Sequence, residues 1–139
     1  SYFSTSGTSH CKDYPSLPLE NLLAESDVVS IHAPLNARTM GLIGEKELSL
    51  MKPSAFILNM GRGGIIDETA LAAAVDQGRI AGAALDVFVS EPLPADNPLL
   101  KVRNADRLRL APHVAWASVE ARERLVGMIA ANIADSISE

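Results

Sequence analysis

Short apolar runs alternate along the chain with stretches in which large apolar residues recur every three or four positions. Runs of this kind that contain valine and isoleucine are typical of strands buried in a parallel sheet. Recurrence every three or four positions is typical of a helix that packs one face on a core. The predicted strands are 28–31, 55–59, 80–87 and 107–111, and the predicted helices are 19–25, 45–51, 68–77 and a last one that Ser118 caps.

Turn-forming residues separate these elements. Pro34 follows the first predicted strand, where it cannot donate a hydrogen bond to a ladder. Asp67 is placed to cap the helix 68–77, and Gly78 is placed to end it. The last helix carries an apolar stripe, which needs a partner surface. This stripe consists of Leu125, Ile129, Ile133 and Ile137.

Strands that alternate with helices predict an α/β fold with a doubly wound parallel sheet. The succession is similar to the second half of a Rossmann-type dinucleotide-binding domain. No G-x-G-x-x-G phosphate loop is present, and the glycines at 61–64 have a different spacing. That loop would precede Ser1. Residues 1–3, Ser-Tyr-Phe, resemble the end of a strand and include no initiator methionine, so we expect the chain to be a fragment.

Composition narrows the class of protein. The chain has 139 residues, of which 47% are apolar and 21% charged, as in an ordinary globular domain. Its apolar runs are too short for a transmembrane helix, and its start does not resemble a signal peptide. A single cysteine, Cys11, excludes an internal disulfide framework and fits the cytoplasm. A net charge of −5 without a basic cluster argues against nucleic acid as a partner.

Three residues whose side chains could take part in binding or catalysis follow the ends of predicted strands, namely Arg62, Glu91 and His113. Open α/β sheets bind ligands beyond the carboxyl ends of their strands. Arg62 could bind a carboxylate with two hydrogen bonds, His113 could transfer a proton, and Glu91 could orient the imidazole. Two plainer interpretations stay open. An arginine among glycines often pairs with a surface carboxylate, and a histidine at a strand end is often structural.

The segments 59–64 (Asn-Met-Gly-Arg-Gly-Gly), 85–88 (Leu-Asp-Val-Phe), Glu91-Pro92 and Pro112-His113 resemble, in this order, the D-isomer-specific 2-hydroxyacid dehydrogenases. The resemblance extends from about Leu19 to Leu125. It implies that Arg62 binds the carboxylate and carbonyl of a 2-oxo acid. It also implies that His113 donates a proton to the carbonyl oxygen and that Glu91 holds the imidazolium form. No metal is expected.

The resemblance further implies a dinucleotide pocket. Its expected residues are Ser4, Pro34, Leu35, Asn59, Met60, Gly61, Arg62, Asp86, His113 and Ala115. NAD is the expected cofactor. NADP stays open, because Ser4 stands where many NAD-specific relatives have an acidic residue. Residues 114–116, Val-Ala-Trp, replace the glycine pair of many relatives and are similar to the glycerate dehydrogenase (hydroxypyruvate reductase) branch. Trp116 could line the pocket or fill a gap between domains.

The expected function is therefore that of an oxidoreductase segment. It would take part in hydride transfer between NAD(P)H and a small 2-oxo acid, with hydroxypyruvate and D-glycerate as the expected pair. Residues 1–118 would form part of the NAD-binding domain, and 119–139 a helix that packs on a substrate domain. The parent protein would be a cytoplasmic homodimer. The alternatives are a dinucleotide-sensing, co-repressor-like binding module and a fragment without activity of its own.

Overall fold

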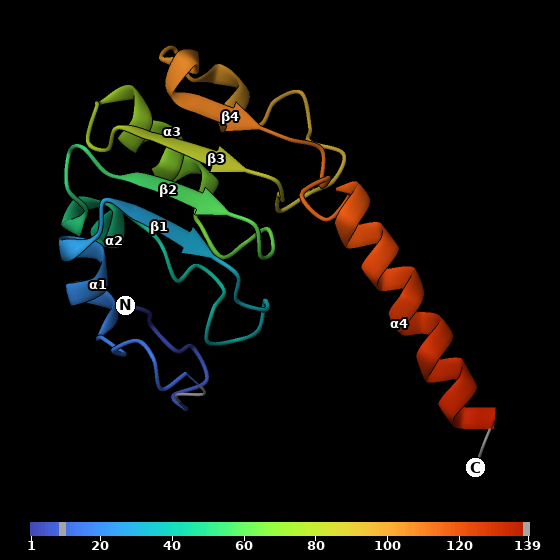
Figure 1. Cartoon of the computed structure of the whole chain (residues 1–139). Coiled ribbons are helices and arrows are strands. Elements are labelled where there is room, and N and C mark those ends of the chain that lie inside the picture. Colours follow the sequence, from blue (N-terminus) through green and yellow to red (C-terminus); the bar gives the residue numbers. More distant parts are fainter. Residues whose placement is uncertain (9–10, 138–139) are drawn as a thin grey trace.

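The computed structural model describes residues 1–8 and 11–137. In these residues four strands form one parallel sheet in chain order (Figure 1). They are β1 (Val28–Ile31), β2 (Phe56–Asn59), β3 (Gly82–Leu85) and β4 (Leu108–Leu110). The connecting helices are α1 (Leu19–Glu25), α2 (Glu45–Leu50) and α3 (Glu68–Asp76). Two short 3₁₀ helices, Pro98–Lys101 and Ala105–Arg107, precede β4. Helix α4 (Val119–Ile137) is the last element of the described residues. The predicted α/β class with a parallel sheet is confirmed.

The strands end in register. Ile31 lies opposite Asn59, Asn59 opposite Leu85, and Leu85 opposite Leu110. The loops that follow β1, β2, β3 and β4 therefore all begin at one edge of the sheet. This edge is the place where the sequence predicted the chemistry.

The predicted strand 80–87 is too long, since β3 covers only Gly82–Leu85. Hydrogen bonds from the Ala81 and Asp86 amides to β2 and its flanks extend the contact by one residue at each end. Beyond Asp86 the chain turns away, because β2 ends at Asn59 and offers no further partner. The close approach predicted near Gly82 is confirmed, since a Cβ there would lie 2.6 Å from the carbonyl oxygen of Arg107.

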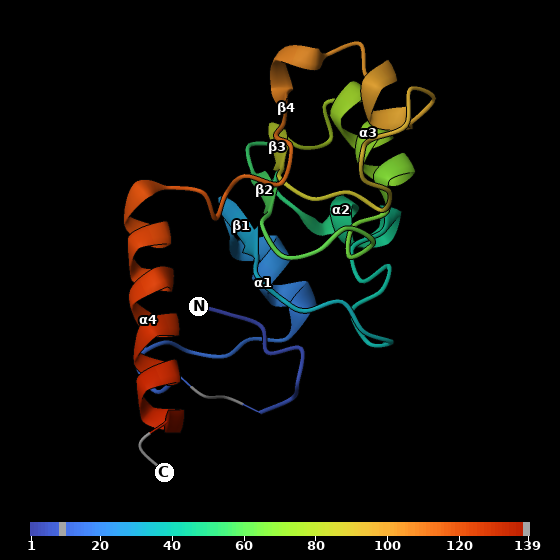
Figure 2. The same ribbon diagram turned by 90° about the vertical axis from the view of Figure 1, so that its right-hand side faces the viewer.

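Helices α1 to α3 cover one face of the sheet (Figure 2). Leu23, Leu48 and Leu71 come from these three helices and are fully buried in a core that includes Ile57 of β2. On the opposite face, Val28 and Phe56 are 59% and 48% exposed. The prediction that β1 is a buried strand is therefore wrong for this face, since no described helix covers it.

The predicted caps of α3 and α4 are confirmed. Asp67 accepts hydrogen bonds from the Thr69 and Ala70 amides, and Gly78 follows α3 with a φ of +65°. Ser118 accepts a hydrogen bond from the amide of Ala121.

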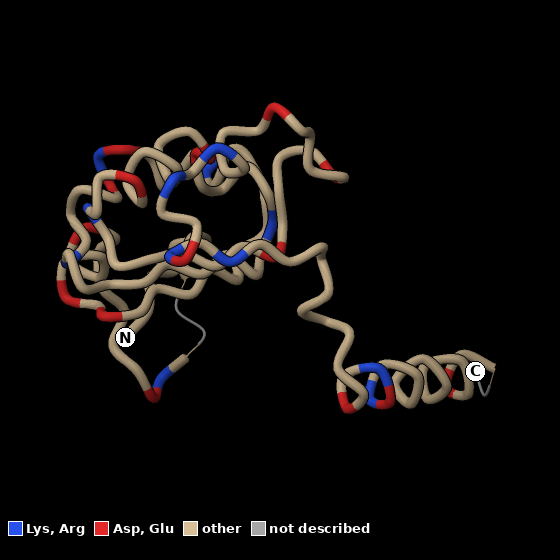
Figure 3. The backbone as a smooth tube through the Cα atoms, turned by 90° about the horizontal axis from the view of Figure 1, so that it is seen from above, with Lys and Arg blue, Asp and Glu red and all other residues tan. Residues whose placement is uncertain are grey.

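Helix α4 extends away from the sheet (Figure 1). None of its residues from 119 to 137 is buried, and the predicted stripe from Leu125 to Ile137 is exposed. Its charged residues gather at the first turns, and most of the remaining helix carries none (Figure 3). The structure therefore shows the stripe, whereas the surface on which it packs stays a prediction.

The start of the chain differs from the expected strand end. Tyr2 forms a single parallel bridge with Ser16, and its neighbours take no part in the four-stranded sheet that the described residues build. A strand needs a paired neighbour along its length, and here only Tyr2 has one. No helix within residues 1–8 and 11–137 is long and apolar enough to cross a membrane.

Candidate active site

The loop after β2 is shaped by its own side chains. Asn59 is buried, accepts a hydrogen bond from the Gly61 amide at 3.0 Å and donates one to the carbonyl of Arg62 at 2.9 Å. A Cβ at Gly63 would collide with the backbone of Phe88, so only glycine fits where this loop passes the β3 loop. Asn59 thus holds the loop that carries Arg62, a role that the sequence did not reveal.

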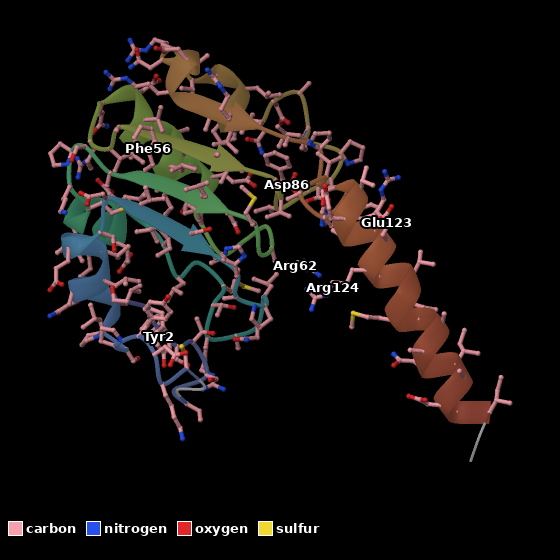
Figure 4. The ribbon with its side chains drawn as sticks, viewed as in Figure 1. Tyr2, Phe56, Arg62, Asp86, Glu123 and Arg124 are labelled. Atoms are coloured by element: carbon pink, nitrogen blue, oxygen red, sulfur yellow. The ribbon has the colours of Figure 1, made fainter. Side chains whose placement is uncertain are left out.

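Arg62 is an exposed side chain at the carboxyl edge of the sheet (Figure 4). Its Nη1 donates to the carbonyl of Gly61 at 2.7 Å. Among the described residues no ion pair within 4.0 Å includes Arg62. The plainer interpretation, an arginine paired with a surface carboxylate, therefore finds no support in this part of the chain.

Glu91 and His113 lie together although 22 positions separate them. Nδ1 of His113 is 2.8 Å from Oε2 of Glu91, and the two side chains are 42% and 36% exposed. Oε1 of Glu91 accepts a hydrogen bond from the amide of Phe88 at 2.9 Å. Because an ionised carboxylate only accepts, Nδ1 donates, which leaves Nε2 as the ring nitrogen that can exchange a proton with a ligand.

The pKa of Glu91 lies below its ordinary value. The hydrogen bond from His113 is the largest cause, and the hydrogen bond from the amide of Phe88 is the next. Burial opposes these hydrogen bonds and raises the pKa, and the charges of His113 and of Arg62 lower it further. Glu91 is therefore an ionised partner for the imidazole at neutral pH.

The backbone around His113 is unusual. His113 has a φ of +56°, in the left-handed region that few residues other than glycine adopt. Asp86, which is 3% exposed and follows β3, accepts hydrogen bonds from the amides of Val114 and Ala115, both at 2.8 Å. The ring nitrogen of Trp116 donates to the carbonyl of His113 at 2.9 Å. Asp86 and Trp116 thus support the turn that presents His113.

The sequence missed this arrangement. It offered Asp86 as a cofactor contact, which stays a prediction, and gave no sign that its carboxylate accepts hydrogen bonds from the turn that follows β4. The one available signal was the expected adjacency of β3 and β4, which brings their carboxyl ends side by side. Trp116, expected to line a pocket or fill a gap, is exposed and holds the turn through its ring nitrogen.

Three hollows follow the carboxyl edge. The first, of about 560 Å³, gathers five of the predicted cofactor residues: Pro34, Leu35, Met60, Gly61 and Arg62. The second, of about 600 Å³, shares His32, Ala33 and Pro34 with the first and runs from there along β1 and α1 to Ser4. The third, of about 450 Å³, is lined by Glu91, His113 and apolar residues of the β3–β4 connection.

The hollows separate the predicted residues into two groups. One group lines the first two hollows, which form a continuous surface because they share Pro34; it consists of Ser4, Pro34, Leu35, Met60, Gly61 and Arg62. The other group, Glu91 and His113, lines the third hollow, and Asn59 lines none of the three. The Ser4 hydroxyl donates to the carbonyl of Thr8 at 2.7 Å. Ala115 contributes its amide to the Asp86 carboxylate and lines none of the three hollows. Within residues 1–8 and 11–137 no cluster of three His, Cys, Asp or Glu could hold a metal ion.

Comparison with known proteins places these features in a family. Residues 2–115 match the family described as D-isomer specific 2-hydroxyacid dehydrogenase, NAD binding domain. A glyoxylate reductase of Korarchaeum cryptofilum is 50% identical over 117 residues, which make up 84% of this chain and 34% of that protein. Glyoxylate/hydroxypyruvate reductase B of Pectobacterium carotovorum is 46% identical over 120 residues, or 86% of this chain and 37% of that protein.

A solved structure agrees with the fold. The acyclic imino acid reductase Bsp5, in complex with NADPH and D-Arg, superposes with a TM-score of 0.83 at 36% identity. The match covers 99% of this chain and 42% of that chain. The chain thus spans about a third of the length of the curated relatives that it matches.

Proposed function

The chain belongs to the D-isomer-specific 2-hydroxyacid dehydrogenases, in their NAD-binding domain, and from this membership we propose that it forms the cofactor side of an enzyme that reduces a small 2-oxo acid to its D-2-hydroxy acid. The observation that carries this proposal is the position of Arg62 and the Glu91–His113 pair at one edge of the sheet. A cation for a carboxylate and a supported proton donor are the two groups that this reaction requires of the protein.

We propose hydroxypyruvate as the substrate, with glyoxylate as the competing candidate. Both are 2-oxo acids, in which a carboxylate stands next to a carbonyl. The two relatives described above carry names that include glyoxylate, and one name also includes hydroxypyruvate. Their similarity supports this class of substrate.

Arg62, His113 and Glu91 would each have a different role in this reaction. Arg62 presents a planar guanidinium, which can bind the substrate carboxylate and polarise the neighbouring carbonyl. His113 donates a proton from Nε2 to the carbonyl oxygen, while Glu91 fixes the ring through Nδ1 and stabilises its charge. The bound dinucleotide supplies the hydride that reduces the carbonyl carbon. In the oxidative direction neutral His113 accepts the proton.

The first two of the hollows described above would hold the dinucleotide. Asn59, Met60 and Gly61 would form the backbone wall of the pocket, and Pro34 and Leu35 would lie beside the adenosine. Ser4 would stand near the adenosine ribose, where a neutral hydroxyl repels neither NAD nor NADP. The surface shared by the two hollows supports this placement, because both include Pro34.

The chain would be part of a longer protein. Residues 1–118 would then belong to the dinucleotide domain, and 119–139 would lead to a substrate domain on which the apolar stripe of α4 packs. The fraction of each relative that the chain spans supports this division. We further propose that the parent is a homodimer in the cytoplasm.

The test is oxidation of NADH and of NADPH by the parent protein, with hydroxypyruvate, glyoxylate and pyruvate offered in parallel. We expect turnover with hydroxypyruvate or glyoxylate, and none from the 139-residue chain alone. The preferred nucleotide would show what Ser4 selects. Nucleotide binding without turnover of any 2-oxo acid would overturn the proposal and favour a dinucleotide sensor.

A further inference from the structure

The conformation of His113 needs support from its surroundings. A non-glycine residue with a φ of +56° is strained and persists only where neighbouring groups hold it. This backbone conformation sets the direction of the His113 side chain, whose Nδ1 lies 2.8 Å from Oε2 of Glu91. If the turn relaxed to a negative φ, the direction of the Cα–Cβ bond would change, and the imidazole would leave the carboxylate.

Asp86 supplies the support from the neighbouring strand end. One of its oxygens accepts the amide of Val114 and the other accepts the amide of Ala115. These two amides directly follow His113. Leu85 and Leu110 are paired in the sheet, so the segment that carries Asp86 and the segment that leads to His113 leave the sheet side by side.

Asp86 is buried, and the backbone of the turn engages both of its oxygens. Its side chain is 3% exposed, and it lines none of the three hollows at the carboxyl edge. Both of its oxygens already receive a charge-assisted hydrogen bond from the backbone. The contacts that this carboxylate makes within the described residues are therefore with the turn.

We propose that Asp86 is a positioning residue, whose carboxylate clamps the amides of Val114 and Ala115 and thereby holds His113 in the left-handed conformation that sets its ring against Glu91. The catalytic meaning of this clamp rests on the proposed function, whereas the clamp itself does not. Trp116 assists from the other side of the turn, through its hydrogen bond to the carbonyl of His113.

The test variant is Asp86→Asn. An asparagine has nearly the same shape but only one acceptor oxygen, so one backbone amide would face an NH₂ group. The clamp is then broken while the volume of the side chain is conserved.

The chain offers a matched control in Asp76. This carboxylate, at the end of α3, accepts hydrogen bonds from the amides of Arg103 and Asn104, at 2.8 and 3.1 Å. Like Asp86 it joins two successive amides to a neighbouring element, and it lines none of the three hollows at the carboxyl edge. Both of these amides are bound by Oδ1, an acceptor that asparagine retains, so Asp76→Asn reports the effect of replacing a carboxylate by an amide at a two-amide contact away from His113.

The first measurement is amide hydrogen exchange in the 139-residue chain, together with the NMR titration of its histidine rings. In the wild-type chain we expect slow exchange at Val114 and Ala115. In Asp86→Asn, exchange at both amides should be faster by about 10²-fold, as for the loss of one charge-assisted hydrogen bond. The titration of the His113 ring should change, and that of His32 should not.

Asp76→Asn should leave the exchange rates of the Val114 and Ala115 amides and the titration of His113 unchanged. Rapid exchange of these amides in the wild-type chain would overturn the proposal even if Asp86→Asn did not fold.

The second measurement is kinetics in the parent enzyme. A displaced imidazole should lower kcat by about 10²-fold, with the KM for NADH changed far less. The pH dependence of kcat/KM should also shift, whereas Asp76→Asn should keep both kcat and the pH profile. A variant in which the KM for NADH rises while kcat and the titration of His113 persist would assign Asp86 to the cofactor instead. An inactive wild-type parent would refute the proposed function and leave the exchange result standing.

Discussion

The two ends of the sheet each carry a side-chain ion pair at 2.8 Å, but the two pairs are held in different ways. At the amino end, Lys52 and Asp27 are 37% and 81% exposed. At the carboxyl end, His113 and Glu91 are 42% and 36% exposed. The second oxygen of Glu91 is bound by the amide of Phe88, and the turn that carries His113 is clamped by Asp86.

The difference shows that the distance between two charges does not distinguish a site from a surface contact. Exposed pairs gain little in water, because they lose side-chain entropy and are screened. What distinguishes the pair at the carboxyl end is that the backbone fixes both partners, one of them in a strained conformation. Variants of the two pairs should therefore differ widely in their effects.

The largest effect is expected for His113→Asn in the parent enzyme. Asparagine tolerates a positive φ, so the turn should survive while the proton donor is lost. We expect kcat to fall by about 10²- to 10⁴-fold. The affinity for NADH should change only slightly, as measured by nucleotide fluorescence titration. An equal loss of NADH affinity would contradict the role assigned to His113.

Arg62→Lys should have the next largest effect. Lysine keeps the charge but cannot form two parallel hydrogen bonds to a carboxylate. We expect kcat/KM for the 2-oxo acid to fall by roughly 10- to 100-fold, as for the loss of one charge-assisted hydrogen bond. Most of the loss should appear in the KM for the 2-oxo acid. Wild-type steady-state constants in this variant would refute the carboxylate contact.

Glu91→Gln should mainly change the pH dependence. Without the carboxylate the imidazolium loses its partner, so the decline of reductive kcat/KM with rising pH should move to lower pH. A profile at the wild-type position would argue against Glu91 as the partner of the imidazolium.

The same variant should also change acid stability. The pKa of Glu91 is lowered in the folded chain, so its stabilisation is present above the ordinary glutamate pKa of about 4.3 and is lost as the pH falls through the lower folded value. The melting temperature of the 139-residue chain should consequently depend less on pH in this acidic range when glutamine replaces Glu91. An unchanged dependence would mean that the pair adds no stability.

The sequence predicted the elements because their signals are local. Periodicity located the α-helices and the strands of the described residues, though not the two 3₁₀ helices, and the caps Asp67 and Ser118 and the stop at Gly78 were correct. The lengths of strands such as β3 depend on the partner strand, which a single segment does not reveal. The exposure of Val28 depends on which helices cover a face, and this too is a property of the whole fold.

The site was predictable to the same extent. Arg62, Glu91 and His113 follow strand ends, which made them candidates, and the resemblance to the family gave each of them a role. The supports were not predictable, because each joins positions that are distant in sequence or uses the main chain. Asp86 reaches Val114 across 28 positions, and the φ of His113 has no sequence signal.

The smallest effect is expected for Lys52→Gln at the amino end. This change removes a 2.8 Å ion pair and leaves the backbone hydrogen bond from Phe56 to Asp27 in place. The free energy of unfolding of the 139-residue chain should change by less than about 1 kcal/mol, and any difference should disappear at high salt. Urea titrations at low and high ionic strength would measure both. A loss of several kcal/mol would mean that the two ends of the sheet are less different than their supports indicate, since a surface pair would then matter as much as a clamped one.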